Sequence, residues 1–462
     1  MSKDLRGFIA KEEERRSGSV IRVKDRIDPN RFETIAFLKH LDLLGEQKMV
    51  LFENVLTLNG KPSPFPLFYN PFITRQFCAD ALDMGDLRNN MDLSLEVAAR
   101  ELKRGELEVI HPPEKAPCKE VVFRGSEADL GMLPIPMHHK DDVGPYLTMT
   151  CIMKGGDKVF YDITFTKNMY YGSQRMSISA HPHHHLRTII EENEEKNKRT
   201  PVIIVLGHHP AFYLSSCCLT PYGNDDYMTA SAFLQEPLRL TPSETWGEDF
   251  LVPADSEIII EGEVPPHKRE SQNPFGEILG YYQPEMKVPI IEVTAITHRK
   301  GAILQDIWSG QMDHWNLGGI PKEGSVFNVI KKNIPGVKAI HLPASGCGRV
   351  ICYISIKKEF ENEPRKAAMQ AFVEMPNLKL AVVVDDDIDV FNEREVMWAV
   401  GTRTHWDKDL EVIRNVQSFR GWLGDAVAVI DATRPLKGDF PKRNEIPQDA
   451  LERVDVSKYI NR

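Results

Sequence analysis

The chain has 462 residues and a formal net charge of −10, with 57 Lys and Arg against 67 Asp and Glu. This length is sufficient for two or three domains with a large buried core. The acidic balance and the lack of a long basic run argue against nucleic acid as the main partner. No apolar run approaches the roughly 20 residues needed to cross a bilayer, and the charged N-terminus lacks a signal-peptide core. We therefore expect a cytoplasmic protein with no membrane partner.

The first third of the chain has a mixed pattern. Leu95, Ala98, Ala99 and Leu102 fall on one face of an expected helix, which Gly105 closes. A proline-rich stretch, 111–117, then reads as a linker into a new unit. This pattern predicts an N-terminal α/β region over residues 1–115.

From about residue 118 to residue 300 the pattern is that of strands separated by turns. Three expected strands illustrate it, each bounded by Gly or Pro: Val202–Leu206, Glu257–Glu263 and Ile290–Ile296. Regularly spaced strands of this kind predict a barrel-like β domain, which we place at 116–305.

The last third alternates strand and helix. Leu380–Val384 reads as a buried strand, and Asn392 with Glu395 reads as a capping box for the following helix. That helix is expected to point Val396, Met397 and Val400 inward. A strand followed by a helix fits an α/β layer domain over 306–440, with a tail at 441–462 that we expect to make an oligomer contact.

Two segments could carry chemistry on residue types alone. Histidines at 181, 183, 184 and 185 could bind a metal or could be surface residues. Glu277 lies between Gly276 and Gly280, so it is either a carboxylate pinned on a turn as a general acid or an ordinary turn residue.

Two further segments are weaker candidates. The acidic turn 385–389 suggests a cation site, but it does not match an EF-hand loop, and helix capping explains it better. The stretch 215–223 has small residues that could present N–H groups to a phosphate, or it could be a simple strand-to-loop junction. The seven cysteines form no CxxC pair, so we expect buried free thiols rather than a zinc site or disulfides.

Taken together and in order, these segments resemble the UbiD family of decarboxylases, over roughly 115–435. The motifs that carry the resemblance are Phe275-Gly-Glu277 with Gly280-Tyr-Tyr282, Thr294–Arg299, Val383–Val390, Val396–Arg403 and Phe233–Pro237. The resemblance implies an α/β (α+β) fold with a central split β-barrel flavin-binding domain between an N-terminal α/β region and a C-terminal α/β domain. The chain is most similar to the branch that acts on hydroxybenzoates and furan dicarboxylates.

The resemblance also implies a cofactor, prenylated FMN, whose phosphate is held by Mn²⁺ or Mg²⁺ with K⁺ nearby. The positions that match the metal ligands are Asp162, where relatives usually have Asn, with His185 and Glu236. Oxygen donors with one imidazole suit these cations. His184 would face the flavin ring, and the turn at Cys217, Cys218 and Leu219 would line the flavin.

The family's active-site triad is Glu-Arg-Glu, and this chain departs from it twice. Its last member corresponds to Glu277, while Gln272 replaces the first Glu and Lys167 replaces the Arg. An alignment that uses Arg175 instead breaks the spacing to His185. Lysine keeps the cation but loses bidentate geometry. A lysine that contacts the flavin phosphate in relatives is not evident around 426–430.

The implied reaction is the reversible non-oxidative decarboxylation of an aromatic, heteroaromatic or α,β-unsaturated carboxylic acid, through a covalent adduct with prenylated FMN. Glu277 would be the proton donor, and Lys167 would hold the carboxylate and contact the cofactor. His314 and Arg349 would read a ring hydroxyl or a second carboxylate, or would be structural residues.

The implied partners are the acid substrate, a flavin prenyltransferase that supplies the cofactor, and copies of the chain in a homodimer or homohexamer. Two alternatives stay open. One is a catalytically reduced subunit of a multi-subunit carboxylase, and the other is a plain FMN-binding oxidoreductase.

Overall fold

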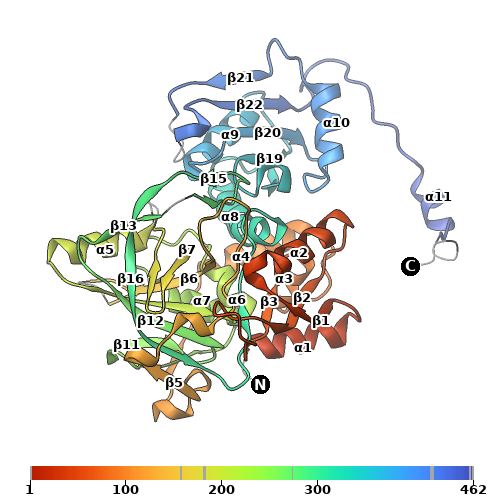
Figure 1. Ribbon diagram of the computed structural model, residues 1–462. Coiled ribbons are helices and arrows are strands. Elements are labelled where there is room, and N and C mark those ends of the chain that lie inside the picture. The colour runs from red at the N-terminus through yellow and green to blue at the C-terminus, as the bar shows by residue number, and fades with distance from the viewer. Residues whose placement is uncertain are drawn as a thin grey trace.

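A computed structural model describes residues 3–156, 159–180, 184–272, 274–416, 421–456 and 459. Figure 1 shows three parts: an N-terminal region in red and orange, a β-barrel in yellow and green, and a C-terminal sheet in blue above them. The long helix α8 (Met312–Asn333) lies where the three parts meet. In this described part of the chain, every helix is too short or too polar to span a bilayer.

The N-terminal region is built on a small sheet with the order β1-β2-β3-β17. Strands β1 and β2 are parallel, and β17 is contributed from far along the chain. A second sheet, in the order β11-β10-β4, ties this region to the barrel domain. The elements are α1 (Leu5–Arg15), β1 (Val20–Ile27), α2 (Glu33–Leu43), β2 (Met49–Val55), β3 (Leu67–Tyr69), α3 (Arg75–Ala81), α4 (Asn90–Glu101), β4 (Leu107–Val109), β10 (Leu238–Ser243), β11 (Gly247–Pro253) and β17 (Leu304–Gln305).

The central part is the expected β-barrel. Its strands follow the order β12-β9-β6-β7-β8-β16, and β16 pairs back onto β12, which closes the sheet. All of these pairs are antiparallel, and β5 and β13 add to β16 at the margins. The strands are β5 (Val121–Arg124), β6 (Tyr146–Lys154), β7 (Tyr161–Gly172), β8 (Arg175–Ser177), β9 (Thr200–Leu206), β12 (Ile258–Val264), β13 (Arg269–Gln272) and β16 (Met286–His298).

Three helices and one short hairpin belong to the barrel domain and shape the site. The helices are α5 (His185–Glu195), α6 (Pro210–Ser215) and α7 (Asp226–Leu234). The hairpin pairs β14 (Phe275–Gly276) with β15 (Tyr282–Gln283).

The C-terminal part is an α/β domain with the strand order β18-β19-β20-β22-β21. Apolar clusters cover both faces of the sheet, one against α8 and α9 and one against α10. The elements are β18 (Val337–His341), β19 (Ile351–Ile356), α9 (Glu363–Glu374), β20 (Leu380–Asp385), α10 (Glu393–Arg403), β21 (Leu410–Ile413) and β22 (Val427–Ala432). The chain then leaves as an extended tail that ends in the exposed α11 (Gln448–Arg453), visible in Figure 1.

Two expected helix faces were only partly correct. On α4, Ala98 is buried as expected, but Leu95 and Leu102 are exposed, and the helix buries Met91, Leu93 and Val97 as well. The reason is tertiary: α4 packs on α8 and α7, and that contact selects a different side of the helix. On α10, Val396 and Val400 are buried as expected, but Met397 is 55 % exposed.

The expected capping box on α10 does not form. Asn392 does occupy the N-cap position, but its side chain makes no capping hydrogen bond. The Glu395 carboxylate accepts from the Asp389 N–H (3.4 Å) and pairs with Arg443 (3.3 Å). The helix boundary was therefore predicted correctly and its capping interaction was not.

Candidate functional site

A cavity of about 520 Å³ lies between the barrel and the C-terminal domain. Its walls come from β7, from the turn between α6 and α7, from the β14–β15 hairpin, from α8, and from loops of the C-terminal domain. This volume is in the range of small-molecule and cofactor sites. Of the candidate residues, those that line it are Asp162, Lys167, His184, His185, Cys217, Cys218, Leu219, Glu277, His314 and Arg349.

Lys167 and Glu277 form an ion pair on this wall. Lys167 projects from β7, and its Nζ lies 3.2 Å from Glu277 Oε1. The two side chains are only 10 % and 15 % exposed. The turn after Glu277 is closed by the Gly280 N–H, which donates to the Glu277 carbonyl (3.0 Å), and Gly280 has a left-handed φ of 76° that favours glycine. A carboxyl and a cation are thus held together facing the cavity.

Gln272 and Arg175, the other two residues considered for the triad, are not among the residues that line the cavity. Gln272 ends β13 and is fully buried, and its amide has no hydrogen-bond partner among the described residues. Its pairing partner on β16 is Met286, which does line the cavity. Arg175, on β8, pairs with Glu270, on β13, and is not among the residues that line the cavity.

A second polar group on the wall consists of Asp162, His185 and Asp226. His185 Nδ1 lies 3.0 Å from Asp162 Oδ1. Asp226, the first residue of α7, accepts from the Ile163 N–H (3.0 Å) and from the Thr220 hydroxyl (2.9 Å). Burial and the charge of Asp162 raise the pKa of Asp226 to about 7. Two carboxylates and an imidazole therefore lie on one wall.

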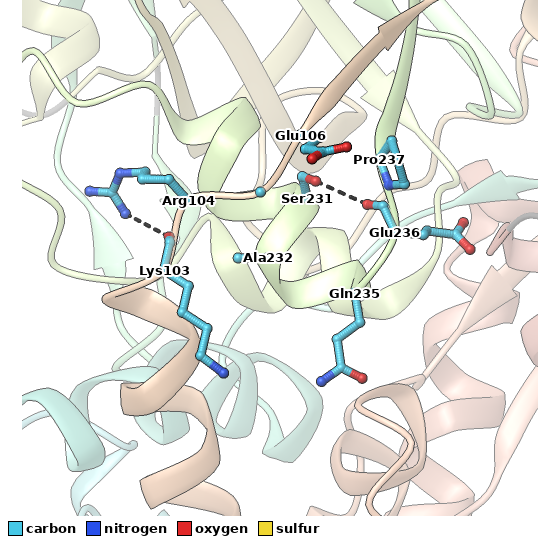
Figure 2. A pocket seen from close by; sticks show the side chains of 9 residues that line it. Lys103, Arg104, Glu106, Ser231, Ala232, Gln235, Glu236 and Pro237 are labelled. Carbon is cyan, nitrogen blue, oxygen red and sulfur yellow. Dashed lines mark hydrogen bonds between the residues drawn. The ribbon is translucent and has the colours of Figure 1, made fainter.

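Glu236 is not part of this group. It follows the left-handed C-cap of α7, and its Oε1 accepts from the Lys3 backbone N–H (2.7 Å). It lines a separate pocket of about 320 Å³, shown in Figure 2 with Gln235 and Pro237 beside it. The nine residues of α7 span about 13 Å, so a side chain beyond one end of the helix cannot meet a ligand at the other end.

The three predicted metal ligands are therefore not brought together, and Asp226 lies where the third was expected. The signal that could have revealed it is the Asn224-Asp225-Asp226 run at a helix start. As the side chains stand in the described part of the chain, no three His, Cys, Asp or Glu residues form a group that could hold a metal ion.

The turn between α6 and α7 and the start of α5 complete this side of the cavity. Cys217, Cys218 and Leu219 line it from the turn, and burial raises the pKa of both thiols. His184 lines it from the N-cap position of α5. His181 and His183 lie outside the described residues.

A third group is cationic, and sequence reasoning missed one of its members. His314 and Lys322 lie two turns apart on α8, on one face of that helix. Burial and the nearby Arg349 guanidinium lower the pKa of Lys322 to about 8. Gly318 lies between His314 and Lys322 on this face, and Arg349 packs against it. A methyl group added to Gly318 would lie 2.7 Å from Arg349 Nη2. The four-residue spacing of positions 314, 318 and 322 is the sequence signal that could have placed Lys322 on the same helix face as His314.

Comparisons with known proteins agree with this architecture. Residues 110–312 match the 3-octaprenyl-4-hydroxybenzoate carboxy-lyase Rift-related domain, and residues 315–420 match the C-terminal domain of the same carboxy-lyase. The chain is 31 % identical over 343 residues to anhydromevalonate phosphate decarboxylase of Methanosarcina mazei, covering 74 % of this chain and 78 % of the relative. It is 29 % identical over 384 residues to gallate decarboxylase of Lactiplantibacillus plantarum, covering 75 % and 76 %.

Among solved structures, an evolved dimeric form of the UbiD-class enzyme HmfF from Pelotomaculum thermopropionicum, in complex with prFMN, superposes with a TM-score of 0.89. The identity is 32 %, and 99 % of this chain and 100 % of that chain are covered. The chain belongs to the UbiD family of carboxy-lyases. The predicted family and fold class are confirmed.

Proposed function

We propose that this chain catalyses the reversible non-oxidative decarboxylation of an aromatic, heteroaromatic or α,β-unsaturated carboxylic acid with prenylated FMN as cofactor. The observation that supports this most strongly is the Lys167–Glu277 pair at 3.2 Å, facing a cavity of about 520 Å³ in a UbiD-family fold. A proton donor beside a cation is what carboxylate binding and carbon protonation require.

The cavity suits a flavin phosphate held through a divalent cation. Asp162 and Asp226 are close enough for the charge of one to raise the pKa of the other, and a cation between them would relieve that repulsion. Two carboxylates and one imidazole suit Mn²⁺ or Mg²⁺. Asp162, His185 and Asp226 are therefore the residues that would hold the metal once their side chains turn toward it, with His184 and the Cys217–Leu219 turn beside the flavin.

When bound, the prenylated flavin would supply an electron sink for the electron pair that departing CO₂ leaves behind. Lys167 would hold the substrate carboxylate by charge before the carbon–carbon bond breaks. As Lys167 turns to the substrate carboxylate, Glu277 would take up a proton from solvent, give it to the carbon that lost CO₂ and be protonated again from solvent. In the reverse direction Glu277 would remove that proton, and high bicarbonate would drive carboxylation.

Two half-buried cations support a substrate that carries a second polar or anionic group. Lys322 and Arg349 line the same cavity as Glu277, and His314 lines it beside them. An anionic substituent placed there could accept charge-assisted hydrogen bonds from both cations. Two relatives are named for acids of this kind, gallate and a phosphate-bearing acid. We therefore expect hydroxylated, dicarboxylated or otherwise anionic acids to be preferred over plain cinnamate.

A catalytically reduced subunit remains the second candidate, and the observation that favours it is Gln272. Its fully buried amide lacks a partner among the described residues and cannot act as an acid. Retention of the Lys167–Glu277 pair favours a working site instead. The K⁺ ion, the prenyltransferase, the homodimer or homohexamer and the cytoplasmic location stay predictions.

The proposed acid is tested with protein co-expressed with a flavin prenyltransferase. Mass and absorbance should identify prenylated FMN, and Glu277→Gln should abolish both turnover and deuterium exchange into product while keeping the flavin. Glu285→Gln, an exposed acid near the same hairpin, is the matched control. Turnover by Glu277→Gln equal to that of the control would refute the assignment.

The metal site is tested by comparing Asp226→Asn with Glu236→Gln. We expect the Asp226 variant to lose bound metal and flavin, and the Glu236 variant to keep both, because only Asp226 lines the cavity. Elemental analysis and flavin absorbance measure the two contents. The reverse result would restore Glu236 as the ligand.

Substrate choice is tested with a panel of plain, hydroxylated and dicarboxylated acids. Losing a hydrogen bond to a charged donor typically costs about 1.5–3 kcal/mol, roughly tenfold to a hundredfold in specificity. Arg349→Ala and Lys322→Met should slow only the polar acids, while Lys338→Met on the exposed side of β18 should change nothing. Equal slowing of every acid would make these two cations structural.

A further inference from the structure

Gly276, the residue before Glu277, is held at both of its backbone polar groups by one segment of the barrel domain. The Gly276 N–H donates to Asp142 Oδ1 at 2.8 Å. The Tyr146 hydroxyl donates to the Gly276 carbonyl at 3.3 Å. Both side chains are buried, with Asp142 6 % exposed and Tyr146 fully covered. The backbone next to the proposed acid therefore has little freedom to rotate.

The same segment also packs against the hairpin sterically. A methyl group on Gly276 would lie 2.1 Å from His139 Nδ1, so the His139 ring lies directly against the Gly276 α-carbon. The Asp141 N–H donates to the Tyr282 hydroxyl at 3.0 Å on the opposite strand of the hairpin. Residues 139–146 therefore contact both strands of the hairpin.

Residues 139–146 are themselves held in place by further contacts. Asp142 Oδ2 accepts from the His139 N–H (2.7 Å), and the Tyr146 ring stacks on His138 at 4.2 Å. His138 Nε2 lies 3.0 Å from Asp306, and Asp306 accepts from the Thr148 N–H (2.8 Å). Thr148 is the strand partner of Lys167. One chain of contacts therefore connects the two members of the Lys167–Glu277 pair through the interior.

The hairpin needs such support. Its strands contribute only the pairs Phe275 with Gln283 and Gly276 with Tyr282. A two-stranded ribbon of this size is not stable alone in water. Its tip is open to solvent, with Tyr281 63 % exposed. Residues 139–146 supply the support for the backbone before Glu277, while the Lys167 pair holds its carboxylate.

We propose that Asp142 and Tyr146 are positioning residues for the proton transfer, which they serve by fixing the backbone of Gly276 on both sides, next to Glu277. This inference rests on Glu277 being the proton donor, as proposed above. Displacement of a reacting group by about 1 Å can cost on the order of a hundredfold in rate. Neither residue is among those that line the cavity, so we expect substrate and flavin binding to be left intact.

The test uses Asp142→Ala, Asp142→Asn and Tyr146→Phe in the protein co-expressed with a flavin prenyltransferase. We expect kcat and the rate of deuterium exchange into product to fall tenfold to a hundredfold in Asp142→Ala. Tyr146→Phe should give a smaller fall of the same kind. Asp142→Asn should lie nearest to wild type, because it keeps an acceptor for the Gly276 N–H. KM and flavin content should stay within twofold of wild type.

Asp141→Ala is the matched control, because its exposed carboxylate is adjacent in sequence while only its backbone contacts the hairpin. The proposal is overturned if kcat and exchange in Tyr146→Phe and both Asp142 variants equal those of this control. It is also overturned if these rates fall only in proportion to lost flavin or lost folded protein. If Asp142→Ala does not fold, Tyr146→Phe still decides between these outcomes.

Glu277→Gln separates this inference from the proposed function. An inactive Glu277→Gln beside wild-type rates in the Asp142 and Tyr146 variants would refute the positioning role alone. An active Glu277→Gln would refute the role of Glu277 as proton donor. Asp142 and Tyr146 would then have no proton donor to position.

Discussion

Replacing Glu323 by glutamine is expected to weaken the junction of the three parts of the molecule. Glu323 lies on α8, and its Oε2 is 2.9 Å from Arg75 Nη1 and accepts from the Ser94 hydroxyl (2.6 Å). Its Oε1 accepts from the Leu342 N–H (3.0 Å) and lies 2.7 Å from His341 Nδ1. One buried carboxylate thus joins the N-terminal region, α8 and the C-terminal domain.

The magnitude follows from the charge environment of this group. Burial opposes ionisation, but the Arg75 charge and the hydrogen bond with His341 prevail and lower the pKa of Glu323 from 4.5 to about 2. That difference corresponds to about 3 kcal/mol of stabilisation. Glutamine would lose the charge and would turn an amide group toward donors, so we expect a loss of about 3 kcal/mol at pH 7.

The pH dependence has a definite sign. Because the folded pKa lies below the unfolded pKa, the stabilisation is fully present above about pH 4.5 and is lost as the pH falls toward 2. The gap in unfolding free energy between wild type and Glu323→Gln should therefore shrink to roughly half by pH 3.

Urea unfolding at several pH values measures this gap. Asp42→Asn is the control, since its pair with Lys39 is half exposed and such pairs contribute about 1 kcal/mol or less. A Glu323→Gln protein as stable as this control, or a gap that does not change with pH, would refute the reasoning.

Three further changes test the packing, each by urea or thermal unfolding. Gly324→Ala would place a methyl group 1.9 Å from the Ser94 carbonyl oxygen, so α4 and α8 must move apart at a cost of about 1–3 kcal/mol. Arg403→Met would leave Asp385, 2.6 Å from its guanidinium, without that partner in a nearly buried site, at a cost of about 3 kcal/mol. Ile204→Ala would open a cavity in the barrel core and cost about 2–5 kcal/mol. A variant that unfolds like wild type would contradict its prediction.

The strands of the fold were predictable from the sequence because their signal is local. Val202–Leu206 and Leu380–Val384 are continuous apolar runs, Ile290–Ile296 is a mostly apolar β-branched stretch, and each lies inside an observed strand. Helix faces depend on the partner instead. Leu95 fitted an apolar stripe on α4, yet Leu95 is exposed because α8 and α7 cover another side.

The residues of the candidate site were predictable only through the resemblance to the UbiD family. Lys167 and Glu277 are 110 residues apart, and no local pattern places them 3.2 Å from each other. Glu236 was chosen because it lies in a recognisable motif, but that motif ends α7, whereas the cavity receives the residue that begins the helix, Asp226. Lys322 was missed because a lysine on a long helix is normally interpreted as a solvated residue, and only the fold shows that it lines the cavity.

The two departures from the family's Glu-Arg-Glu triad are consistent with each other on electrostatic grounds. An arginine fork can serve two carboxylates at once, whereas a lysine is a point charge that matches one. With the neutral Gln272 in place of the first Glu, only Glu277 is left to be paired, and Lys167 pairs with it at 3.2 Å. An arginine here would leave part of its fork without a carboxylate in a nearly buried site, which carries a desolvation cost. Lys167→Arg alone would keep the charge but leave part of the fork without a carboxylate, and Gln272→Glu alone would add a second carboxylate that a lysine point charge does not match. Changing both together would give an arginine fork two carboxylates.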